Sequence, residues 1–172
     1  MNLSDLANII EILGVFALVF AISFGLVQLK NYRRQRRDLA IWECARSFED
    51  EDFSEPYRLL SELPHGLSKS QFEELGEKYV SAAMRICLKF ETAGLLVHRG
   101  VIPIDAMDDL VGGAALKIWR VIEQWVAETR VSTSHPSFTE WYQWLVERLE
   151  ERGRAEREPA FISQANWKEP KI

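Results

Sequence analysis

The chain has 172 residues, so about 140 remain after an apolar N-terminal segment, enough for one ordinary domain with its own core. The formal net charge is −5: residues 1–29 carry −2 and residues 30–37 carry +5, which leaves −8 for residues 38–172. Because affinity for phosphates needs a large cationic face, this acidic main part argues against nucleic acid as a partner. Cys44 and Cys87 lack metal-ligand spacing and fit free core thiols in a reducing compartment.

Residues 9–29 form the strongest pattern in the sequence. Residues 12–29 contain no formally charged side chain, and as a helix they rise about 27 Å, close to the roughly 30 Å hydrocarbon core of a bilayer. The pattern predicts a transmembrane helix over residues 9–29, preceded by a short extracytoplasmic segment, residues 1–8. A cleavable signal peptide has cations before its apolar run, whereas here they follow it, so we interpret the segment as an uncleaved signal anchor.

A basic collar follows the apolar segment at once, over residues 30–37. Its five cations, expected to lie on anionic lipid headgroups, are Lys30, Arg33, Arg34, Arg36 and Arg37. The positive-inside rule places the N-terminus outside and residues 30–172 in the cytoplasm. The sequence thus predicts a single-pass protein of the inner (cytoplasmic) membrane.

Small residues recur on one face of the predicted span, at Gly14, Ala17, Ala21 and Gly25. This spacing lets a second helix approach closely, which favours a homo-oligomer or docking on the membrane helix of a protein partner. The alternative is that this face contacts lipid.

Beyond the collar the periodicity is helical throughout and predicts an all-α fold, a small helical bundle over residues 38–157 followed by a polar tail, residues 158–172. The first helix is expected to continue to about residue 48, and further helices to cover residues 54–63, 70–99, 105–129 and 137–150. The polar sequence after Glu150 is expected to be loosely held. Gly112 and Gly113 lie inside a predicted helix, which indicates either close packing against Ala93 and Gly94 or a local kink or π-bulge.

Three groups of residues are candidates for a specific role. Asp105, Asp108 and Asp109 share a helix start, where capping and the helix dipole account for them, although Asp105 and Asp109 could present a carboxylate pair. Glu91 and either Arg120 or Arg130 could form a structural ion pair between two helices. The remaining group, which could fill the core or form an aromatic patch for a partner, is Trp119, Trp141 and Trp144.

No nucleotide-binding, metalloprotease or nucleophile-elbow motif occurs in the sequence, and the three histidines lack ligand spacing. We therefore expect no catalytic residue, no cofactor and no metal, and hence no enzyme.

The second half of the sequence resembles a known family. The resemblance depends on spaced residues around two turns and three helices: Phe90, Glu91, Gly94, Leu96, Arg99, Gly100, Ile102, Asp105, Trp119, Arg130, Phe138 and Trp141. The family consists of uncharacterised prokaryotic membrane proteins, catalogued as a domain of unknown function. The resemblance implies one N-terminal span, a basic collar and a small helical cytoplasmic domain, and it implies no activity.

The sequence favours a non-enzymatic interaction, scaffolding or regulatory module at the membrane, since no convergent chemistry accompanies the ample helix surface. Two alternatives remain open, namely a membrane-perturbing oligomeric effector and a carboxylate–metal enzyme that uses Asp105, Asp109 and Glu91.

Overall fold

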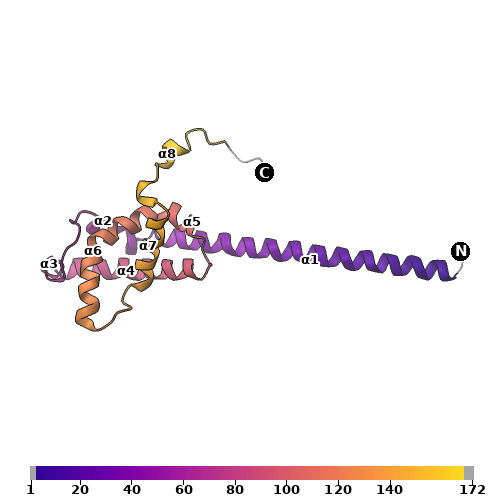
Figure 1. The fold of residues 1–172 in the computed structure, drawn as a ribbon, viewed down its shortest axis with the longest axis horizontal. Coiled ribbons are helices and arrows are strands. Elements are labelled where there is room, and N and C mark those ends of the chain that lie inside the picture. The colour runs from indigo at the N-terminus through magenta and orange to yellow at the C-terminus, as the bar shows by residue number, and fades with distance from the viewer. Residues whose placement is uncertain (1–2, 169–172) are drawn as a thin grey trace. The chain divides into compact units, whose positions relative to one another are not determined.

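The computed structural model describes residues 3–168, and for residues 3–12, 15 and 155 it describes the backbone alone. Every regular element in this range is helical, which confirms the predicted all-α class (Figure 1). The chain divides between Trp42 and Glu43 into two compact units, each of which is considered by itself. The sequence had suggested a boundary at residue 38, directly after the collar.

Helix α1 (Leu3–Ser47) runs without a break from the predicted span through the collar. It contains no proline, and its leucine, alanine and arginine residues have good helix propensity. At its end the hydroxyl of Ser47 donates to the carbonyl of Cys44. The expectation that one helix continues to about residue 48 is therefore confirmed.

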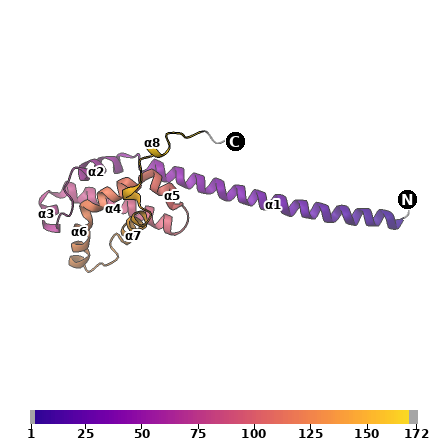
Figure 2. The same cartoon turned by 45° about the horizontal axis from the view of Figure 1, so that its top comes forward.

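The second unit is a helical bundle centred on α4 (Glu77–His98). Helix α4 packs against α2 (Glu51–Ser61) and α7 (Glu140–Glu151), and α6 (Gly113–Thr133) packs against α2 and α7. Figure 1 and Figure 2 both show α7 crossing this group of helices. All of these helices and α3 contribute large, fully buried side chains, among them Leu60, Phe72, Ile86, Phe90, Ile118, Ile122, Tyr142, Leu145 and Leu149.

Phe90 of α4 is at the centre of an aromatic cluster. Its ring centroid lies 4.6 Å from that of Tyr142, 5.4 Å from that of Phe48 and 5.8 Å from that of Phe53. The buried hydroxyl of Tyr142 donates to the carbonyl of Ala115 on α6, at 2.9 Å. One residue of α7 thus joins α4 and α6, and aromatic contacts of this kind add to the free energy of apolar burial.

The long helix predicted from residue 70 is interrupted, because α3 (Lys69–Glu74) ends before α4 begins. Gly76 separates the two helices with φ +100°, a conformation that residues with a Cβ rarely adopt. Helix α3 starts with a capping box, in which Ser68 accepts from the amide of Gln71 and the side chain of Gln71 accepts from the amide of Ser68.

The helical stretch around Gly112 and Gly113 contains the π-bulge that was one of the two expected explanations. Helix α5 (Ile104–Met107) leads into a π-helical turn, Asp108–Gly112, and then directly into α6. The other explanation, packing of these glycines against Gly94, is wrong: a Cβ at Gly94 would overlap the backbone carbonyl of Trp141 on α7.

Two helix starts differ from the prediction. Helix α2 begins at Glu51, so the acidic residues Glu51 and Asp52 occupy its first turn instead of preceding it. Helix α7 begins at Glu140, three residues later than expected, after Thr139 with φ +57°. The segment after α7 forms a 3₁₀ turn (Arg154–Glu156) and a short helix α8 (Ala160–Ser163).

Candidate functional site

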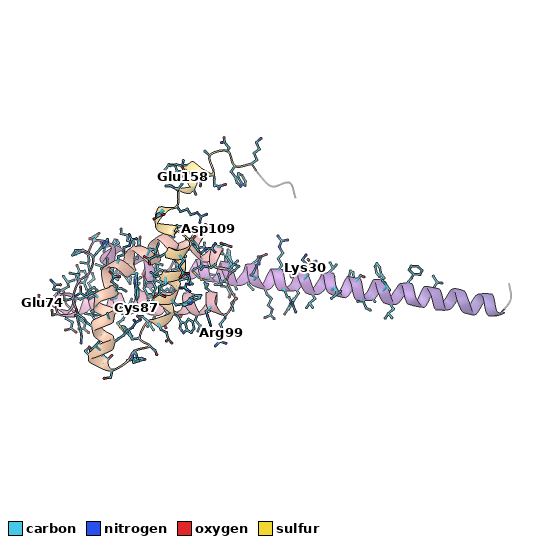
Figure 3. All side chains as sticks on the ribbon, in the orientation of Figure 1. Lys30, Glu74, Cys87, Arg99, Asp109 and Glu158 are labelled. Carbon is cyan, nitrogen blue, oxygen red and sulfur yellow. The ribbon has the colours of Figure 1, made fainter. Side chains whose placement is uncertain are left out.

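The apolar side chains of α1 are exposed on every side of the helix. Successive residues of a helix are 100° apart, and all described side chains from residue 13 to residue 39 are exposed. Phe16 is 69% exposed and Phe20 is 72% exposed. In Figure 3 the side chains before Lys30 project from the ribbon in several directions. A helix that is apolar all round is typical of a core or a bilayer, and no described residue covers this one.

In the part of the chain whose side chains are described, no helix is both long enough and apolar enough to cross a membrane. Residues 9–12 and residue 15 of the predicted span lie outside that part. The span therefore stays a prediction.

The five collar cations are exposed along α1. Arg34 lies 4.0 Å from the carboxylate of Asp38, and Arg36 donates to the hydroxyl of Tyr32 at 2.8 Å. These are contacts within one helix, one turn apart, so they leave the guanidinium groups on the surface. Gly14 and Gly25 on the small-residue face are equally open, since a Cβ at either position would meet nothing within 4 Å.

Glu91 does not form the expected ion pair with Arg120 or Arg130 among the described contacts. Its carboxylate instead accepts a hydrogen bond from the backbone amide of Tyr142, at 2.9 Å. Tyr142 is the third residue of α7, and the amides of a first turn have no partner within the helix. Glu91 therefore caps α7 from α4.

Arg130 holds the same end of α7 from α6. Its guanidinium donates to the carbonyls of Phe138 and Thr139 and, at 2.6 Å, to the side chain of Gln143. Arg130 and Glu91 thus take the Phe138 carbonyl and the Tyr142 amide, which would bond to each other in a helix that started at residue 137. Arg120 is exposed and takes no part.

The three tryptophans are divided between core and surface. Trp119 is buried and its ring lies 5.0 Å from that of Tyr142. Trp141 and Trp144 are half-buried, with ring centroids 4.4 Å and 5.4 Å from that of the exposed His98. Trp141 and Trp144 thus form an aromatic patch at the α4–α7 surface, one of the two expectations for these tryptophans. Trp119 fills the core, which was the other.

The aspartates at the π-helical turn face arginines that the sequence analysis did not single out. Asp108 is buried; its Oδ2 lies 3.2 Å from Arg157 and its Oδ1 lies 3.1 Å from Arg154. The Oδ1 contact lacks hydrogen-bond geometry, so we treat it as electrostatic. Arg157 also lies 3.0 Å from Asp109, and Arg152 pairs with Asp105.

A pocket of about 360 Å³ lies at this cluster, lined by Asp105, Asp108, Asp109, Arg152 and Arg157. Figure 3 shows Asp109 beside the chain segment that follows α7. The three arginines at positions 152, 154 and 157 are visible in the sequence. To match them to these aspartates, one would have had to predict where α7 ends. Residues 152–157 contact the bundle through these ion pairs, and the expectation that the segment is loosely held stays a prediction.

Each of the three carboxylates thus has a guanidinium partner. No group of three or more histidine, cysteine, aspartate or glutamate residues suited to a metal ion occurs in the described part of the chain. Burial raises the pKa of the Cys87 thiol, and the nearby Glu91 carboxylate raises it further. Burial also raises the pKa of Cys44.

Comparison with known families assigns the chain. Residues 8–149 match the family described as a domain of unknown function (DUF4760), which covers more than half of the chain. The chain belongs to this family. The match includes α1 from residue 8, the collar and the bundle as far as residue 149 in α7, and it ends before the arginines of residues 152–157. No curated protein and no solved structure matches the chain.

Proposed function

We propose that this DUF4760 protein is a non-enzymatic interaction module that α1 holds at a membrane. The observation that carries the proposal is the exposure of apolar side chains all around α1, directly before five exposed cations. In water such a surface is unfavourable by about 25 cal/mol per Å² of apolar area, whereas a bilayer interior would bury it. The cations then fit the cytoplasmic headgroup region.

The charge distribution supports the same arrangement. With −8 on residues 38–172, the bundle is repelled by anionic lipid while the collar is attracted to it. The bundle is thus presented to protein partners and not laid on the lipid surface. Half-exposed Trp141 and Trp144 beside His98 offer an aromatic area of the kind that is enriched in protein interfaces.

Alkaline carbonate extraction of membranes tests the anchor. The full-length protein is expected in the membrane pellet, and the double substitution Leu18→Lys and Ile22→Lys is expected to shift it to the supernatant. Each lysine near the centre of a span opposes insertion by about 2.5–3.5 kcal/mol.

The matched control carries Val131→Lys and Phe161→Lys, two side chains of the bundle unit that are 81% and 80% exposed. This variant should remain in the pellet. Release of the unsubstituted protein by carbonate would refute the anchor, and a C-terminal reporter active only in the periplasm would refute the orientation.

A further inference from the structure

We propose that residues 152–157, here called the C-terminal strap, cover the π-helical turn and can be released from it. The strap and the turn then open together as one local unit. The proposal concerns the bundle alone and does not depend on membrane anchoring.

Charge is what holds the strap. Arg152, Arg154 and Arg157 reach Asp105, Asp108 and Asp109, and the sequence of the strap, Arg-Gly-Arg-Ala-Glu-Arg, offers no large apolar side chain to the core. The side chains of Arg152 and Arg157 are 44% and 52% exposed, and pairs at such exposure stabilise little. The Arg154–Asp108 pair is more shielded, at 24% and 6% exposure, so the strap depends mainly on the contacts of Asp108 and should open at a lower free energy than the whole bundle.

Release of the strap must disturb the π-helical turn. The side chain of Asp108 is 6% exposed, and Arg154 and Arg157 provide its charge partners. Without them its carboxylate would be a buried, unpaired charge, which is strongly unfavourable. Asp108 would therefore move to solvent, and the turn would rearrange with it.

The absence of a side chain at Gly112 leaves room for the Asp108 carboxylate in the π-helical turn. The Asp108 carboxylate folds back over Gly112, so a Cβ there would lie 2.5 Å from Asp108 Oδ1. The neighbouring Gly113 differs, because a Cβ there would lie 3.5 Å from Arg154 Nη2, which is an ordinary contact. Gly112→Ala should therefore displace the Asp108 carboxylate, whereas Gly113→Ala should not. Neither substitution changes the charge of the chain.

Opening has a consequence for the end of the chain. The strap precedes Phe161, Ile162 and Trp167, whose apolar side chains are exposed in the described structure. Gly153, the second residue of the strap, has φ +70°, and the conformational freedom of glycine lets the chain swing there when the ion pairs are lost.

Hydrogen exchange of the full-length protein under native conditions tests the proposal. The amides of residues 109–113 and 153–157 are expected to exchange much faster than those of α4, because the strap and the turn open locally. Added salt should accelerate this exchange, since it screens the ion pairs. Gly112→Ala is expected to raise it at least tenfold in both segments, whereas Gly113→Ala should leave it within about twofold.

Exchange of both segments at the rate of α4, as in global unfolding, would overturn the proposal, and so would equal effects of the two alanine variants. If Gly112→Ala lowers protection throughout the bundle, the double variant Arg154→Gln and Arg157→Gln decides. It must raise exchange in residues 109–113 while Arg148→Gln, at an arginine paired with Glu151, does not.

Discussion

Two glycines show how the absence of a single Cβ decides which segments can touch. Gly94 lets the backbone of α7 approach α4 at Trp141, and Gly112 leaves room for the carboxylate of Asp108. In a helix interior glycine is unfavourable by about 1 kcal/mol relative to alanine. At these positions the close contacts outweigh that loss.

Gly94→Ala is predicted to destabilise the bundle, since its Cβ would overlap the carbonyl of Trp141. Overpacking of this kind costs about 1–3 kcal/mol. Urea denaturation should show a lower midpoint with an unchanged slope. Gly113→Ala is the matched control, expected to be neutral or slightly stabilising, and equal midpoints for the two variants would contradict the close contact.

At the scale of elements, short helices are held by polar groups from longer ones. Helix α3 is docked on α6 through the amide of Lys69, which donates to Glu128 Oε2 at 2.7 Å. Gln124 donates to Oε1 of the same carboxylate at 2.9 Å. The side-chain hydrogen bond from Gln124, followed by the backbone bond from Lys69, lowers the pKa of Glu128. The start of α7 is fixed similarly by Glu91 and Arg130.

The docking of α3 is predicted to weaken in acid. Because the pKa of Glu128 is lower in the folded than in the unfolded state, its contribution is fully present above the unfolded pKa and is lost as the pH falls through the folded pKa. Glu128→Ala should thus lower the urea midpoint at about pH 7 and have a smaller effect at about pH 3. Glu123→Ala, on the exposed face of the same helix, is the control. A pH-independent difference between wild type and Glu128→Ala would contradict this role.

At the scale of the whole molecule, the chain has two units of different chemistry. The first has an apolar helix with a cationic end, and the second is an acidic bundle with its own core. The match to DUF4760, residues 8–149, extends over both units.

Association through α1 is the prediction at this scale. If Ala21 and Gly25 lie in a helix–helix interface, leucine at both positions should reduce crosslinked dimer in membranes by roughly tenfold, or about 1.4 kcal/mol. Val19→Leu with Ser23→Leu changes the opposite face at the same spacing and should have little effect. Unchanged crosslinking with leucine at Ala21 and Gly25 would exclude this face.

The sequence alone determined the features that depend on neighbours within one or two turns. The helical periodicity and the uninterrupted α1 arise from contacts three to five residues apart, and the π-bulge near Gly112 was one of the two explanations that the local sequence offered. The spaced residues between Phe90 and Trp141 also indicated a family catalogued as a domain of unknown function, and the comparison finds such a domain over residues 8–149.

Only the tertiary structure decided where α7 begins and which partners the aspartates take. Glu91 reaches an amide 51 residues away, and Asp108 meets an arginine 49 residues away. Such pairs depend on how the helices pack, so no local pattern could distinguish Arg130 as a backbone clamp from Arg130 as an ion-pair partner. Local propensity sets the helices, and long-range packing sets which charges they bring together.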